Sequence, residues 1–234
     1  LEAEARRIQR RPAVAVSSGT LAVWSALQAL RSTRDGVVVV PAFGFPVTAR
    51  MAAMTHGRIR VVDVSGDAPI IDVDQAADAA QAPDVAVVVA INYLDNVVDC
   101  DAMRRRMPQD ARIMEDSAGS WLSGSGTRRA GDGGDVAAVS LHVSKVVGGG
   151  EGGLVFASDP ELIRTLDRIR SNGLSDTVHY RASGQLGMNI RITELTAAAT
   201  LASLRTFKMR VGLRQAVRHS YDNALAELTE RGRV

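Results

Sequence analysis

Short, continuous apolar runs alternate with segments of helical periodicity, and this alternation restricts the fold more than any other feature of the sequence. The clearest runs are residues 84–91 (DVAVVVAI) and residues 37–40 (VVVV). Strands that are apolar on both faces are typical of parallel sheets covered by helices on both sides. Alternating strands and helices also favour right-handed crossover connections between parallel strands. The sequence therefore predicts an α/β fold, a three-layer α/β/α sandwich around a mainly parallel sheet.

The predicted elements follow one another without internal repeats or low-complexity linkers. Helices are assigned where apolar residues recur at three- and four-residue spacing, as Leu162, Leu166 and Ile169 do. The residues between 65 and 83 are expected to form a polar stretch with two short apolar pairs. The predicted strands are residues 13–16, 37–40, 59–64, 84–91, 111–114, 136–141 and 153–157, and the predicted helices are residues 21–30, 46–54, 101–107, 159–170, 193–204 and 210–230.

Composition argues against several classes of function. The formal net charge is +2, and the arginines are scattered without interleaved aromatic residues, so no nucleic-acid partner is expected. No apolar run approaches the roughly 20 residues that cross a bilayer, so no membrane partner is expected either. Cys100 is the single cysteine, which excludes an internal disulfide and favours a reducing, cytoplasmic location. The flanking acids Asp99 and Asp101 should raise the pKa of this thiol and leave it unreactive.

Polar residues follow three of the predicted strands, where open α/β sheets place their binding sites. Ser18, Gly19 and Thr20 open a helix, whose free N–H groups and dipole favour a phosphate, although such a turn is more often only a helix cap. Asp116 ends the strand over residues 111–114. The strand over residues 136–141 leads into SLHVSKVVGGGEGG, which contains Lys145. On composition alone, a surface position for Lys145 would be favoured over a site role.

Other readings of the glycine stretch do not fit. A phosphate-binding P-loop ends in Gly-Lys-Ser/Thr, whereas here the lysine precedes the glycines. A dinucleotide-binding turn would follow the first strand, and SSGTLAV lacks its glycine pattern. No spacing of His, Cys or carboxylates resembles a metal site. What remains is a phosphate-binding helix start, an acid at a strand end and a lysine in a glycine-rich turn. Pyridoxal 5'-phosphate (PLP) requires these parts, for its phosphate, its pyridine nitrogen and its aldehyde.

Five segments, in order, resemble the DegT/StrS family of PLP-dependent sugar aminotransferases, which belongs to fold type I, the aspartate aminotransferase superfamily. SSGTLAVWSAL is similar to that family's SGT-Ala-Leu phosphate turn, and VPAFGFPVTA to its P-x-x-T-F segment. MEDSAGS is similar to its EDAAQ segment, and GMNIRITELTAAATLASL to its GxNxRMTELQAA segment. GDGGDVAAVSLHVSKVVGGGEGG, the most specific of the five, resembles its lysine loop. Five motifs in order favour the Schiff-base role of Lys145 over a surface role.

The resemblance implies a PLP-dependent transferase-like large domain and a role for individual residues. Lys145 would form the Schiff base with PLP and later move the proton, and Asp116 would pair with the pyridinium. Phe45 would stack on the ring. Asn189 would reach the phosphate of the neighbouring subunit, which implies a homodimer with shared active sites. The cofactor phosphate would be held by Ser140 and by the backbone at Gly19, Thr20 and Leu21.

The resemblance also implies the reaction: transfer of an amino group, with glutamate as donor, to a keto-sugar or a similar keto metabolite in nucleotide-sugar or antibiotic biosynthesis. Two alternatives stay open, namely a different PLP-dependent reaction on the same scaffold and a non-catalytic PLP-binding remnant. Gly119 motivates the first, because the family usually has Gln or His there, near the phenolic oxygen of PLP.

The domain division is a further implication of the resemblance. Residues 1–205 are expected to form the PLP-binding large domain. Residues 206–234 are expected to form a helix that leads toward a small C-terminal domain, which is absent or truncated here. The usual N-terminal segment is also missing, and we expect the N-terminus to be incomplete.

Overall fold

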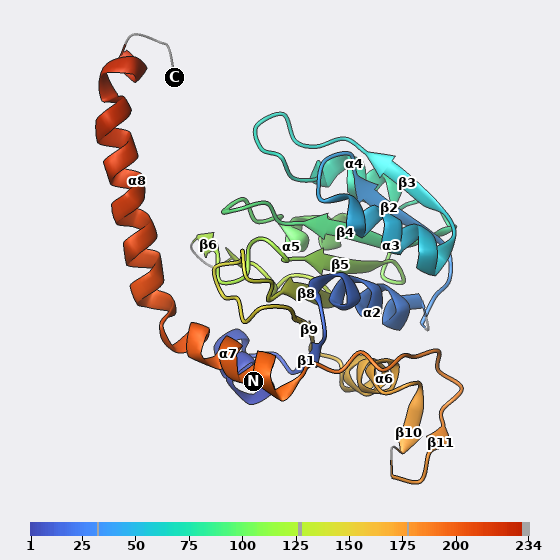
Figure 1. Cartoon of the computed structure of the whole chain (residues 1–234). Helices are drawn as coiled ribbons and strands as arrows, with labels where there is room; N and C mark the ends of the chain where they lie inside the picture. Colours follow the sequence, from blue (N-terminus) through green and yellow to red (C-terminus); the bar gives the residue numbers. More distant parts are fainter. Residues whose placement is uncertain (32, 126–127, 177, 231–234) are drawn as a thin grey trace.

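A computed structural model describes residues 1–31, 33–125, 128–176 and 178–230 (Figure 1). Its centre is a seven-stranded sheet in the order β1-β9-β8-β5-β4-β2-β3. Neighbours from β3 to β8 pair in parallel, and β9 pairs antiparallel with both β8 and β1. The predicted mainly parallel sheet is therefore confirmed, with β9 reversed. The strands are β1 (Ala13–Val16), β2 (Val37–Pro41), β3 (Ile59–Val62), β4 (Val85–Ile91), β5 (Arg112–Asp116), β8 (Val136–Ser140) and β9 (Gly153–Ala157).

The apolar strands are buried because helices cover both faces of the sheet. Successive residues of β2, such as Val38 and Val39, point to opposite faces of the sheet and belong to different core clusters. The first face is covered by α2 (Gly19–Arg31), α3 (Pro46–His56) and α6 (Pro160–Arg170). The other face is covered by α4 (Val73–Ala79), α5 (Cys100–Arg106), α1 (Glu2–Gln9) and α7 (Glu194–Arg205). The three-layer α/β/α architecture is confirmed.

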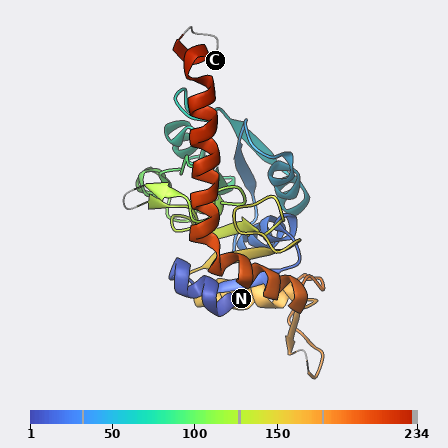
Figure 2. The ribbon, with the colours of Figure 1, turned by 60° about the vertical axis from the view of Figure 1, so that its left-hand side comes forward.

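Two parts project from this body (Figures 1 and 2). Helix α8 (Phe207–Glu230) extends away after α7, and most of its described side chains are exposed. The small hairpin of β10 (Leu174–Asp176) and β11 (Arg181–Ala182) extends at the opposite side. A second hairpin, β6 (Gly124–Ser125) with β7 (Arg128–Arg129), follows β5. Among the helices of the described ranges, none is long and apolar enough to span a bilayer.

Several predicted boundaries were wrong. The strand predicted to reach residue 64 ends at Val62, because Val64 instead pairs with Ile71 in an isolated bridge. Helix α4 was not predicted; Asp72 caps it, accepting hydrogen bonds from the backbone N–H groups of Asp74 and Gln75. Helix α8 begins at Phe207 rather than at 210. The predicted rise in the pKa of the Cys100 thiol is confirmed, but its main cause is burial of the thiol rather than the flanking acids.

Candidate active site

The alternation of side chains along the strands decides which residues can meet at the ends of the sheet. Asp116 pairs with Ala138 across β5 and β8, so Asp116 and Ser140 lie on the same face, the one that α2 and α3 cover. Glu115 lies on the opposite face. There its carboxylate accepts hydrogen bonds from the N–H groups of Gly131, Gly133 and Gly134 and shapes that loop. The two adjacent acids thus have separate tasks, and only Asp116 faces the site.

A cavity of about 670 Å³ opens at this end of the sheet. It is lined by residues from the first turn of α2, the start of α3, the ends of β4, β5 and β8, and the loop that joins β8 to β9. Segments far apart in the sequence therefore meet at one place, as predicted. Six of the predicted residues line the cavity, namely Gly19, Thr20, Phe45, Asp116, Ser140 and Lys145.

Asp116 lies at the bottom of the cavity and is 4% exposed. One carboxylate oxygen accepts a hydrogen bond from the Thr48 hydroxyl at 2.5 Å, and the other accepts one from the Ala118 N–H at 3.0 Å. Burial raises the pKa of Asp116, while these hydrogen bonds and the charge of Lys145 act in the opposite direction. A buried carboxylate with a raised pKa is suited to a cationic partner in the cavity, which would compensate the cost of burying its charge.

The start of α2 lies close to Ser140. A Cβ atom added at Gly19 would lie 2.6 Å from both Cβ and Oγ of Ser140, a distance too short for a side chain. Glycine thus allows the N-terminus of α2 and the Ser140 hydroxyl to share one corner of the cavity, an arrangement suited to a phosphate. The N–H of Leu21 donates to the Ser18 hydroxyl at 3.2 Å, so this predicted phosphate donor has an intramolecular partner.

Lys145 lies in the loop between β8 and β9, which several contacts hold in place. Its own N–H donates to the His142 carbonyl at 2.9 Å, and the Gly148 N–H donates to the Ser203 hydroxyl of α7 at 3.2 Å. At Gly149 a Cβ would lie 2.1 Å from Thr200 Oγ1, so α7 packs directly on the glycine backbone. No described residue gives the Lys145 amine a hydrogen bond or ion pair. These contacts hold the loop in place and leave the Lys145 side-chain amine without a partner among the described residues.

Three side chains beside Lys145 form a polar chain along the edge of the cavity. His142 Nδ1 accepts from the Ser144 backbone N–H at 3.2 Å and lies 2.8 Å from the Ser144 hydroxyl. With Nδ1 as acceptor, neutral His142 carries its proton on Nε2, which lies 3.6 Å from a Glu151 oxygen. All three line the cavity.

Gly119 lines the cavity, as predicted, and a Cβ placed on it would have no atom within 4 Å. Phe45 also lines the cavity but is 75% exposed. It immediately precedes α3, where Pro46 begins the helix. The open space at Gly119 and the aromatic ring at Phe45 are both compatible with a flat ligand above Asp116.

Sequence reasoning missed several residues of the cavity, among them Thr48, Asn92 and Arg214. Thr48 holds Asp116, and Asn92 donates to both Glu115 and Ser117 while its oxygen accepts from the Val98 N–H. Arg214 reaches the cavity from α8. Thr48 and Arg214 have no local signal, because they reach the cavity from helices that are distant in sequence from its other residues. Asn92 alone could have been suggested, since it follows β4 at the same end of the sheet.

Asn189 does not line the cavity of its own chain. It is exposed, and its backbone forms an isolated antiparallel bridge with Ser171. The predicted role of Asn189 at the phosphate of a neighbouring subunit stays a prediction.

Comparison with solved structures defines the class of fold. An aminotransferase of the DegT/DnrJ/EryC1/StrS type from Brucella abortus is 25% identical, with a TM-score of 0.79 over 97% of this chain and 62% of that one. The enzyme DesV of S. venezuelae, solved with a ketimine intermediate, is 28% identical, with a TM-score of 0.81 over 96% of this chain and 60% of that one. The fold is that of PLP-dependent aminotransferases.

The sequence gives the narrower assignment. The chain belongs to the DegT/DnrJ/EryC1/StrS aminotransferase family, whose sequence profile matches residues 2–234, and the predicted family resemblance is confirmed. It is 30% identical over 219 residues to the dTDP-3-amino-3,4,6-trideoxy-alpha-D-glucose transaminase of Micromonospora megalomicea subsp. nigra. That alignment covers 93% of this chain and 58% of the relative, so the chain spans less than two thirds of its length.

Proposed function

We propose that this chain is the PLP-binding part of an aminotransferase that moves an amino group from an amino acid, glutamate in the first instance, to a keto-sugar. The observation that carries the proposal is the single cavity shared by Asp116, Ser140, Lys145 and the start of α2. Family membership supports the same reaction.

The residues of the cavity fit PLP. The close approach of Gly19 to Ser140 leaves a corner with N–H and O–H donors for the phosphate. Buried Asp116, with its raised pKa, suits a protonated ring nitrogen, and Phe45 can lie against the ring. Lys145 has the free amine that the aldehyde requires. Bound PLP supplies an electron sink for the bonds of the carbon that carries the amino group.

The protein's own groups then have distinct tasks. The Asp116 carboxylate would keep the proton on the ring nitrogen, and Thr48 and Ala118 hold that carboxylate in place. The Lys145 amine would hold the cofactor covalently and would move a proton at the amino-bearing carbon. The turn through His142 and the packing of α7 on Gly149 determine where that amine lies.

The names of the relatives support a nucleotide-linked sugar as the keto substrate. One acts on a dTDP-linked amino sugar, and another, 26% identical over 223 residues, is the GDP-perosamine synthase of Caulobacter vibrioides. Both names contain a nucleoside diphosphate. The proposed acceptor is accordingly a keto-sugar attached to a nucleoside diphosphate.

We also propose a homodimer with shared active sites. The exposed position of Asn189, outside its own cavity, supports a contribution to a second copy. The proposed division into a PLP-binding domain over residues 1–205 and a following helix is supported by the change from α7 to α8 at Thr206. The last residues of the second part, 231–234, lie outside the described residues. We also propose a reducing, cytoplasmic location, because the sequence has one cysteine, Cys100, which is buried and free.

The test uses the scarcity of lysine, since the chain has only Lys145 and Lys208. Purified protein should have a visible absorption band that shifts when L-glutamate is added and disappears on borohydride reduction. Peptide mapping of the reduced protein should then find the pyridoxyl label on Lys145. A label on Lys208, or no label, would contradict the proposal.

A further inference from the structure

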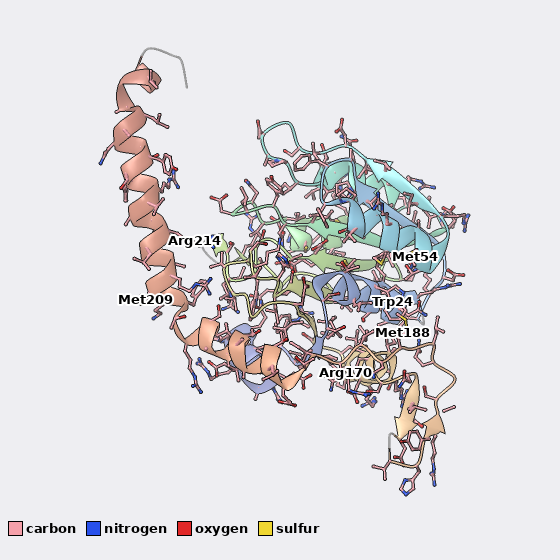
Figure 3. All side chains as sticks on the ribbon, viewed as in Figure 1. Trp24, Met54, Arg170, Met188, Met209 and Arg214 are labelled. Carbon is pink, nitrogen blue, oxygen red and sulfur yellow. The ribbon has the colours of Figure 1, made fainter. Side chains whose placement is uncertain are left out.

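Helix α8 extends away from the body, yet one of its side chains reaches the cavity. Arg214 lines the cavity together with Lys145 and Glu151, and in Figure 3 it lies between α8 and the loops of the body. The helix is otherwise mostly exposed, so this contact is not a consequence of core packing.

The position of Arg214 follows from how α8 is attached. One turn earlier, Arg210 donates a hydrogen bond to the Ser203 hydroxyl, which also accepts the Gly148 N–H of the lysine loop. Residues four apart lie on the same face of a helix, so Arg214 faces the same loop. Arg218, a further turn along, instead pairs with Asp222 at 3.6 Å and does not line the cavity.

The guanidinium of Arg214 is uncommitted: no described residue gives it a hydrogen bond or an ion pair. The acids that line the cavity have other partners. Asp116 is held by Thr48 and Ala118, and the Glu151 carboxylate faces the His142 imidazole. A permanent positive charge with a planar fork of donors at the edge of a substrate cavity is suited to a carboxylate or a phosphate.

We propose that Arg214 binds the anionic group of an incoming substrate at the edge of the cavity. The inference rests on the proposed function, which provides two sources of such a group. One is the carboxylate of the amino donor, and the other is the diphosphate of the nucleotide-linked sugar.

Calorimetric titration of the chain purified with PLP tests the proposal, with L-glutamate in one arm and dTDP in the other. Arg214→Gln should weaken one ligand by about tenfold or more, the size of a lost charge-assisted pair. The ligand whose affinity falls shows whether Arg214 binds the carboxylate of the amino donor or the diphosphate of the nucleotide-linked sugar. Arg214→Lys, which keeps the charge but loses the planar fork, should lose less affinity. The matched control is Arg218→Gln, on the same helix but outside the cavity.

Three outcomes overturn the proposal: unchanged affinity for both ligands in Arg214→Gln, equal weakening in the Arg218→Gln control, and a wild-type protein that binds neither ligand. The visible absorption band is recorded on the same samples. Absence of the band in a protein that still binds dTDP through Arg214 would refute the proposed cofactor, but not the role of Arg214.

Discussion

The floor and the edge of the cavity are built differently. The floor consists of Asp116, Ser140 and Thr48, buried side chains at the ends of strands or at the start of α3. The edge consists of exposed side chains, with Phe45 75% exposed where Asp116 is 4% exposed. Residues on rigid elements keep their geometry without a ligand, whereas exposed residues gain order from one. Substitutions at the floor should therefore change the stability of the protein, and substitutions at the edge should change catalysis or substrate binding with little change in stability.

The largest effect is expected at Lys145. Lys145→Ala should abolish transamination and borohydride labelling, because no other described residue of the cavity offers an amine. The melting temperature of the protein without PLP should change little, since the Lys145 side chain has no hydrogen bond to lose. Activity assays, mass mapping and thermal melts give the readouts. A large loss of thermal stability would show that Lys145 stabilises the protein as the floor residues do, and would contradict the difference between floor and edge.

Asp116→Asn, a substitution at the floor, should change both the rate of turnover and the stability of the protein. The variant should keep PLP but turn over about ten- to a hundredfold more slowly, because a charged hydrogen bond is worth about 1.5–3 kcal/mol.

The same change should stabilise the protein without PLP. Burial raises the pKa of Asp116, so the folded state holds a proton that the unfolded state has released. The wild type therefore loses stability as the pH rises above 3.8, the ordinary value, through the folded-state pKa, and the neutral amide does not. Thermal melts from pH 3 to pH 8 should show a gap that opens with rising pH. If the difference in melting temperature between the two proteins were the same at every pH, ionisation of Asp116 would not destabilise the folded state.

An added methyl group should have a large effect at one glycine of the cavity, Gly19, and little effect at another, Gly119. Gly19→Ala would place a Cβ 2.6 Å from Ser140, so we expect weaker PLP binding and a loss of about 1–3 kcal/mol in stability from overpacking. Gly119→Ala is the matched control, because its Cβ would meet open space. Cofactor titration and urea unfolding of both variants decide the matter. Equal effects at the two positions would mean that the start of α2 is not in tight contact with Ser140.

The smallest effect is expected from Gly119→Gln. The longer side chain can donate a hydrogen bond toward the phenolic oxygen of PLP, worth about 1 kcal/mol, or about 1.5–3 kcal/mol if that oxygen is charged. PLP should bind to both proteins, and the pH midpoint of the visible band should differ between them. Superimposable titration curves would show that Gly119 does not face the cofactor.

Sequence reasoning found residues at the ends of strands better than residues that reach the cavity from helices, for a physical reason. Asp116 and Ser140 end apolar strands, and strand ends meet at one side of a parallel sheet, so their proximity follows from local patterns alone. Thr48 and Arg214 reach the cavity through packing between distant segments, which no local pattern encodes. Helix α4 was missed because it spans 7 residues, too few for a periodicity to emerge, and its capping residue Asp72 was the remaining signal. Its buried face is mainly alanine, which gives only a weak apolar pattern.

The reversed strand β9 has a consequence for the order of events during translation. Within the described seven-stranded sheet the neighbour of β1 is β9, where Val16 meets Gly153, and Val16 also forms an isolated bridge with Arg191. The ribosome therefore produces β1 some 137 positions before its hydrogen-bonding partner. At roughly 5–20 residues per second this delay is about 7–30 s. For most of this delay the nascent chain has no Ser140 and no lysine loop for the start of α2 to contact, because both lie beyond residue 139. The corner that we propose for the phosphate is thus assembled late, when the first and last strands of the sheet come together, after β2, β4 and β5 have had time to pair.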